Sequence, residues 1–105
     1  MWILQSSGTE SEELTFRLRP GGIKTVGRAP RADFIVDAAL VSRLHCRLEA
    51  GADNLDVIDL SSTNGTYVNG TRVKRARLTS GDRLRVGRIE LTVEKAERGA
   101  GRARR

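Results

Sequence analysis

The feature that most constrains the fold of this chain is an apolar–polar alternation with a period of two residues. It recurs in the segments 14–18, 44–48 and 89–93, where every second side chain is apolar. Successive side chains of a β-strand point to opposite faces, so each segment is predicted to be a strand with one face on a core. No window of ten residues has a 3.6-residue apolar period, and the chain is therefore predicted to be all-β. Shorter apolar runs between Gly-rich or Asn-Gly turn signals predict further strands at 2–5, 23–26, 34–36, 54–60, 66–68 and 82–86.

Many short strands with close spacing are typical of an antiparallel β-sandwich or barrel. At 105 residues the chain is large enough for one hydrophobic core and one domain. Charged residues make up 30% and hydrophobic residues 38%, which is the balance of a globular protein, and no apolar run is long enough to cross a bilayer. The N-terminal segment has no signal-peptide pattern, and a single cysteine, Cys46, suits a reducing compartment. We therefore expect an intracellular protein, cytoplasmic or nuclear, with Cys46 in the core.

The net charge of +6 is concentrated at the C-terminus. Residues 95–105, KAERGAGRARR, hold five basic residues and one acid, which leaves 14 basic and 12 acidic residues for 1–94. The tail also lacks large apolar side chains, so it is predicted to be disordered or a linker. The predicted domain, residues 1–94, is nearly balanced in charge.

Three segments between predicted strands, 26–33, 40–45 and 61–65, carry groups suited to binding an anion. A phosphate has close to two negative charges and three acceptor oxygens, so a forked guanidinium with flanking hydroxyls matches it. Loops at one end of a sandwich are common sites of function. The candidate ligands are the guanidinium groups of Arg28 and Arg43, the hydroxyl and main-chain N–H of Ser42, the hydroxyl of Thr63, and the side-chain amide of Asn64, which can grip a peptide main chain.

Four motifs in these and later segments occur in an order that resembles the forkhead-associated (FHA) domain over essentially all of residues 1–94. They are GR at 27–28, SRLH at 42–45, STNGTYVNG at 62–70 and GDRLRVG at 81–87. The resemblance implies an eleven-stranded antiparallel β-sandwich of the SMAD/FHA-like type. It also implies a binding module that is not an enzyme, needs no cofactor or metal, and recognises phosphothreonine on protein partners downstream of a Ser/Thr kinase. We expect a monomer.

The resemblance also assigns roles to individual residues. Arg28, Ser42 and Thr63 correspond to phosphate ligands, Arg43 to a further contact with phosphate or peptide, and Asn64 to the residue that holds the peptide backbone. Gly27, His45 and Gly65 correspond to structural residues that hold the binding loops in shape. In this family the loop before the serine helps to select the residue third after the phosphothreonine. Here that loop contains Leu40 and Val41 and no base, so a hydrophobic residue is expected there.

Two other functions, hydrolysis and nucleic-acid binding, have some support in the residues themselves. A hydrolase triad of Ser42, His45 and Asp59 lacks a nucleophile elbow, and Ser42 and His45 are predicted to lie on opposite faces of a segment that enters a strand. Nucleic-acid binding through a basic loop at 72–78 and the tail is the stronger rival, although the chain has only four aromatic residues for base stacking. His45 and Cys46 are too few for a zinc site.

Overall fold

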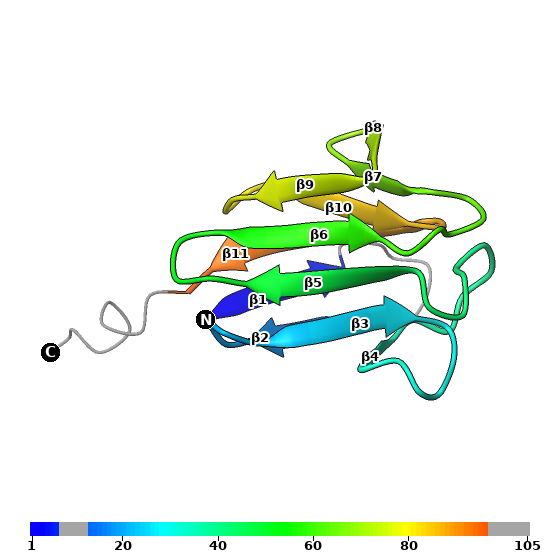
Figure 1. Cartoon of the computed structure of the whole chain (residues 1–105), viewed down its shortest axis with the longest axis horizontal. Coiled ribbons are helices and arrows are strands. Elements are labelled where there is room, and N and C mark those ends of the chain that lie inside the picture. Colours follow the sequence, from blue (N-terminus) through cyan, green and yellow to red (C-terminus); the bar gives the residue numbers. More distant parts are fainter. Residues whose placement is uncertain (7–12, 97–105) are drawn as a thin grey trace, which may run out of the picture.

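The computed structural model describes residues 1–6 and 13–96, and it confirms an all-β sandwich (Figure 1). Two sheets pack face to face, and the described residues contain eleven strands and no helix. The six-stranded sheet has the order β2-β1-β11-β10-β7-β8, and the five-stranded sheet has the order β4-β3-β5-β6-β9. The strands are β1 (Trp2–Ser6), β2 (Thr15–Leu18), β3 (Ile23–Gly27), β4 (Phe34–Ile35), β5 (Cys46–Ala50), β6 (Leu55–Asp59), β7 (Thr66–Val68), β8 (Thr71–Val73), β9 (Arg75–Leu78), β10 (Arg83–Val86) and β11 (Ile89–Lys95).

The strand pairing departs from the expected pattern at one edge. All pairs are antiparallel except β3 and β4, which run parallel with Val26 opposite Phe34 and Gly27 opposite Ile35. The segment 28–33 carries the chain from the end of β3 to the sheet edge, where the short strand β4 runs in the same direction as β3. The second sheet is therefore mixed.

The basic segment 72–78 is not a loop, and that prediction was wrong. All of its residues except Lys74 belong to β8, which pairs with β7, or to β9, which pairs with β6. Both are edge strands with mostly polar, outward-facing side chains, so they lack a long apolar alternation; Leu78 alone is fully buried. Arg75 and Arg77 form ion pairs with Asp56, which reduces the charge available to nucleic acid.

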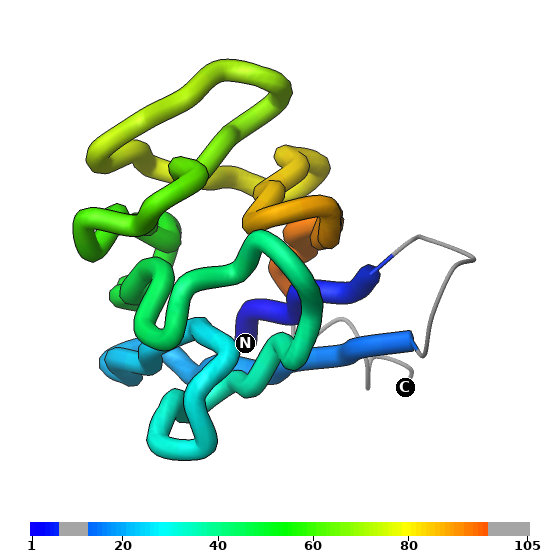
Figure 2. Tube along the Cα trace, turned by 90° about the vertical axis from the view of Figure 1, so that its right-hand side faces the viewer, coloured from blue at the N-terminus to red at the C-terminus, as the bar shows by residue number. Residues whose placement is uncertain are grey.

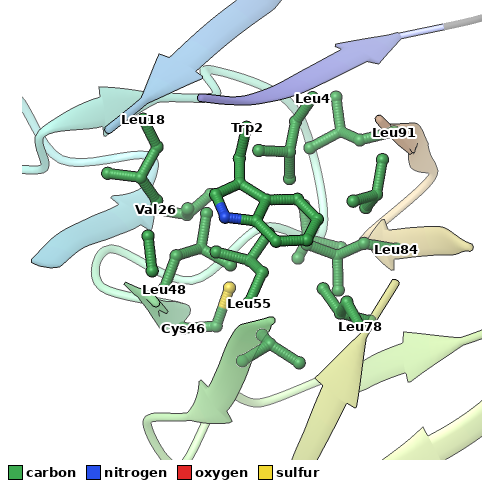
Figure 3. Packing of buried hydrophobic residues seen from close by; sticks show 14 of the residues in the cluster. Trp2, Leu4, Leu18, Val26, Cys46, Leu48, Leu55, Leu78, Leu84 and Leu91 are labelled. Carbon is green, nitrogen blue, oxygen red and sulfur yellow. The ribbon is translucent and has the colours of Figure 1, made fainter. Parts of the chain in front are cut away.

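The core lies between the sheets and is built around Trp2 (Figure 3). The indole is 1% exposed and donates its N–H to the carbonyl oxygen of Gly51 at 3.1 Å, so its one polar atom is satisfied. Cys46 is fully buried in the same core, as the alternation predicted. The buried apolar residues are Trp2, Leu4, Leu18, Val26, Val36, Val41, Cys46, Leu48, Ala50, Leu55, Val57, Leu78, Leu84, Val86, Leu91 and Val93.

The loops that carry the predicted ligands meet at one end of the sandwich, which faces the viewer in Figure 2. They follow β3, β4 and β6, and the turn between β10 and β11 lies beneath them. At the opposite end, the N–H of Ala96 bonds to the carbonyl oxygen of Met1 at 2.8 Å, so the ordered sheet extends just past the predicted boundary at 94. The rest of the predicted tail, 97–105, lies outside the described residues.

No helix in the described part of the chain could span a membrane.

Burial makes the Cys46 thiol unreactive, which gives a test of the core. Desolvation, reinforced by the nearby charge of Asp59, raises the pKa of this thiol to about 12. The thiolate is the reactive form, so at about pH 8 only roughly one molecule in ten thousand carries it. The native protein should therefore resist iodoacetamide, and the protein unfolded in guanidinium should react at the rate of a free thiol, as followed by mass spectrometry. Equal rates in the two states would contradict the buried position.

Candidate functional site

An open pocket of about 450 Å³ lies at the loop end of the sandwich. Four of the predicted ligands, Arg28, Ser42, Thr63 and Asn64, line it although they come from three separate loops. The remaining lining residues belong to the segment 37–41 between β4 and β5. The fold thus brings cationic, hydroxyl and amide groups together beside a wall of four apolar residues and one carboxylate, Asp37.

Arg28 follows directly after β3 and is tied to the next loop by its main chain and its side chain. Its backbone N–H donates to the carbonyl oxygen of Ser42 at 2.9 Å, and its Nε donates to the carbonyl oxygen of Val41 at 3.0 Å. The Nε bond fixes the direction of the guanidinium. Within the described residues, its two Nη groups bond to no protein atom, and they remain available to an anion.

Gly27 allows this close approach of the two loops. A Cβ at that position would lie 2.1 Å from the carbonyl oxygen of Arg43, a distance that no side chain can tolerate. The same carbonyl oxygen accepts the N–H of Ala29 at 3.1 Å. The Arg43 side chain is exposed and does not line the pocket, so its predicted contact with a ligand has no counterpart in the pocket geometry.

His45 links the loop 40–45 to the loop 61–65. Its Nδ1 accepts the backbone N–H of Ser42 at 3.0 Å, which leaves the ring proton on Nε2, and Nε2 donates to the carbonyl oxygen of Gly65 at 2.8 Å. The imidazole has no exposed surface, and both of its nitrogens are paired. The main-chain N–H of Ser42, which we expected to be a ligand, is therefore already in use.

The prediction that Ser42 and His45 lie on opposite faces was wrong. Strand β5 begins at Cys46, one residue later than His45, so His45 is not part of the alternation and turns inward. The contact with Ser42 is through the backbone, and the Ser42 hydroxyl instead accepts the N–H of Thr63 at 3.0 Å. A serine whose Oγ has no hydrogen bond to the imidazole is not arranged as an activated nucleophile.

Thr63 and Asn64 present their side chains at the rim of the pocket, and both residues are exposed. The Asn64 amide donates to the carbonyl oxygen of Leu40 at 3.1 Å, which leaves its own oxygen free within the described residues. The Ser42 hydroxyl accepts from Thr63 but keeps its proton to donate. The rim therefore offers two hydroxyl donors and an amide oxygen beside the Arg28 guanidinium.

Asp59 shapes the 61–65 loop from below, a role that the sequence analysis missed. Its Oδ1 accepts the hydroxyls of Ser62 at 2.5 Å and Thr66 at 2.7 Å, and its Oδ2 accepts the N–H of Ser62 at 3.1 Å. The Ser62 hydroxyl in turn accepts the N–H of Gly65 at 3.0 Å. Burial of the carboxyl opposes ionisation, but these hydrogen bonds outweigh it and lower the pKa of Asp59 below its ordinary value. The sequence signal was the Asp-Leu-Ser-Ser turn at 59–62.

Gly65 and Leu40 have backbone conformations that most side chains avoid. Gly65 has a φ of +92°, and a Cβ there would lie 2.6 Å from Nε of Arg72. Leu40 has a φ of +71° although it carries a side chain, and it is 46% exposed at the pocket rim. Gly87, directly after β10, allows the 37–41 segment to pack closely against this turn. A Cβ at Gly87 would lie 2.9 Å from the Val41 side chain. Strained backbone residues cluster at ligand-binding sites, so Leu40 is a candidate contact residue of this pocket.

The described residues contain no group of three or more His, Cys, Asp or Glu side chains that could hold a metal ion.

Comparison with known proteins gives one family. The family model described as FHA domain matches residues 24–87. The ABC transporter ATP-binding/permease protein Rv1747 of Mycobacterium tuberculosis is 40% identical over 78 residues, which are 74% of this chain and 9% of that protein. The glycogen accumulation regulator GarA of the same organism is 38% identical over 69 residues, 66% of this chain and 43% of that protein. The match thus covers less than half the length of either relative.

The fold agrees with a solved domain from a structural and functional analysis of phosphothreonine-dependent FHA domain interactions. The two structures superpose with a TM-score of 0.78 and 30% sequence identity, over 91% of this chain and 97% of the other.

The ionised state of Asp59 gives a prediction for the stability of the loop. Asp59→Asn places an amide NH₂ against the donors of Ser62, and we expect the loss of about 1 kcal/mol and roughly 5 °C in the Tm at neutral pH. A carboxyl with a lowered folded-state pKa stabilises the fold above its unfolded-state value of about 3.8, and this contribution is lost as the pH falls through the folded-state value.

Thermal unfolding of both proteins by circular dichroism between about pH 7 and pH 2.5 checks this prediction. The gap in Tm should be full above about pH 5 and should close below the lowered pKa. Asp53→Asn, at a carboxylate whose side chain is 89% exposed, is the control and should change the Tm little. A gap that stays constant over this range would rule out the ionised carboxylate as its cause.

Proposed function

The chain belongs to the FHA domain family, and we propose that it is a phosphothreonine-dependent protein-interaction module that binds a partner through the pocket at its loop end. The observation that carries the proposal is that Arg28, Ser42, Thr63 and Asn64 converge on one pocket from three loops. The solved relative with phosphothreonine-dependent interactions supports the same choice of ligand.

The phosphate would be bound by the groups that the scaffold leaves free. The Nη groups of Arg28 would donate charge-assisted hydrogen bonds to the phosphate oxygens, and the hydroxyls of Ser42 and Thr63 would add neutral ones. Because the loops are already held by backbone bonds, little conformational entropy is lost on binding. The free oxygen of the Asn64 side chain would accept a main-chain N–H of the peptide, and Arg43 would reach the ligand only from outside the pocket.

The wall of the pocket suggests the composition of the peptide. Ala38, Ala39 and Leu40 form a largely apolar surface, and Leu40 is exposed in a strained conformation. An exposed aliphatic side chain at this rim fits a hydrophobic residue third after the phosphothreonine. The phosphothreonine of such a partner would be made by a Ser/Thr kinase, so the proposed function includes a part in kinase signalling.

Removal of the Arg28 guanidinium tests the phosphate site. Arg28→Ala should weaken binding of a phosphothreonine peptide at least about tenfold, because a charge-assisted hydrogen bond is worth roughly 1.5–3 kcal/mol. Arg31→Ala is the matched control, since Arg31 is an exposed arginine of the same loop that does not line the pocket. Isothermal titration should show near-parent affinity for that variant. Parent-like affinity for Arg28→Ala would exclude the pocket as the phosphate site.

The choice of phosphothreonine is tested with one peptide made in four forms, with phosphothreonine, phosphoserine, aspartate or threonine at the central position. Phosphoserine should bind several-fold more weakly, because one buried methyl group contributes about 0.8 kcal/mol. Aspartate has one charge and two oxygens in a different geometry, so it and unmodified threonine should not bind measurably. Fluorescence anisotropy of labelled peptides gives all four affinities. If phosphothreonine and threonine bound equally well, the proposed function would be refuted.

A further inference from the structure

Arg72 lies beside the pocket and has no role in the phosphate site described above. It is in the middle of β8, the edge strand of the six-stranded sheet, directly opposite Tyr67 of β7. Its side chain covers Gly65, because a Cβ built on that glycine would lie 2.6 Å from Nε and 2.9 Å from Cζ. Gly65 follows Asn64 in the chain, so the guanidinium of Arg72 rests on the loop that forms the pocket rim.

Arg85 lies on the other flank of the same tyrosine. It is opposite Tyr67 in the β7–β10 register, with Cζ 4.1 Å from the centre of the phenol ring. Its Nη1 donates to the carbonyl oxygen of Gly87 at 3.1 Å, beneath the 37–41 segment of the pocket. Tyr67 thus separates two guanidinium groups, and Arg85 is held in place by stacking and a hydrogen bond.

Neither arginine is neutralised by a carboxylate within the described residues. Glu90 is opposite Arg85 in the sheet register, but no ion pair within 4.0 Å joins them in this part of the chain. The neighbouring Arg75 and Arg77 differ, because both pair with Asp56 on the outer face of the other sheet. Two guanidinium groups without an ion-pair partner in this part of the chain lie beside a pocket for an anionic peptide, and such groups attract further negative charge.

We propose that Arg72, assisted by Arg85, forms a second anion subsite that binds another negative group on the same phosphothreonine-bearing segment. The group is a carboxylate or a second phosphate, since a guanidinium fork fits both. The proposal rests on the proposed function, and it adds a rule of partner choice: acidic or doubly phosphorylated segments bind better than neutral ones. The partner is a protein segment, because Arg72 lies against Gly65, next to the Asn64 rim of the pocket to which the phosphothreonine is assigned.

The test uses phosphothreonine peptides in an alanine background that carry one glutamate, placed at each flanking position in turn. A second set carries phosphoserine in place of the glutamate. Against the all-alanine phosphothreonine peptide, at least one position should bind about three- to fivefold tighter with glutamate, and still more tightly with phosphoserine. The gain should shrink as the salt concentration rises, because exposed charges are screened. A gain with glutamate shows that a carboxylate is sufficient, and a gain with phosphoserine at a position where glutamate gives none identifies a second phosphate as the bound group.

Variants separate a direct contact from loop support. In Arg72→Gln the gain should fall to near one, and in Arg85→Gln it should fall in part. Arg83→Gln is the control, because Arg83 is an exposed arginine at the first residue of β10, the end away from Gly87, and should keep the full gain. The measured quantity is the affinity for each charged peptide divided by the affinity for the all-alanine phosphothreonine peptide, both with the same variant. A loss of affinity that is equal for all peptides leaves this ratio unchanged.

Two results would overturn the second anion subsite: no position shows a gain in either peptide set, or the gain survives in Arg72→Gln. If the gain survives while Arg72→Gln weakens all peptides equally, Arg72 supports Gly65 and does not contact the ligand. A different outcome is that an oligonucleotide binds the parent protein as tightly as the best peptide does and loses this affinity in Arg72→Gln. That result would instead assign these arginines to nucleic-acid binding. If the all-alanine phosphothreonine peptide itself does not bind the parent protein, the proposed function fails, and the second anion subsite fails with it.

Discussion

The pocket depends on one buried imidazole. His45 accepts the N–H of Ser42 on one side and donates to the carbonyl oxygen of Gly65 on the other, so the two loops that carry most of the candidate ligands are joined through its ring. A buried imidazole is costly unless both nitrogens are paired, and here each nitrogen has a backbone partner. A replacement side chain would need both an acceptor for the N–H of Ser42 and a donor for the carbonyl oxygen of Gly65. Without either one, the corresponding backbone group would lose its hydrogen bond.

The remaining contacts around the site make this link rigid. The backbone bond from Arg28 to Ser42 fixes the first loop to the second, and Asp59 holds the third loop through Ser62 and Thr66. These bonds use the groups that face the scaffold and leave the Arg28 Nη groups and two hydroxyls for a ligand. The strain at Leu40, φ +71°, is maintained by this framework, and it places an apolar side chain at the pocket rim.

The sequence predicted the strands with a clear two-residue alternation, and the family resemblance supplied the sandwich and the ligand set. The Asn69-Gly70 turn was also predictable, because Asn and Gly tolerate positive φ. Both residues have positive φ in the turn between β7 and β8. Strands β8 and β9 were missed because their outward residues are charged edge positions. The inward turn of His45 was missed because periodicity cannot show where a strand begins. The role of Gly87 depends on a contact with the distant residue Val41, which no local pattern encodes. Arg72 contacts Gly65 across the β7–β8 hairpin, and Asp59 bonds within the turn at 59–62, so both had local signals that the sequence analysis did not use.

The most direct test of the central claim, that the loops joined by His45 form the phosphate site, is to follow backbone amides by ¹H–¹⁵N NMR during titration with a phosphothreonine peptide. The account predicts that the largest shifts fall on Arg28, Ser42, Thr63 and Asn64, with a smaller one on Gly65, whose carbonyl oxygen is bonded to His45. It also predicts that the strands at the opposite end stay unchanged. Shifts centred on the sheet faces, for example on Arg75 and Arg77, or no shifts at saturating peptide, would contradict it.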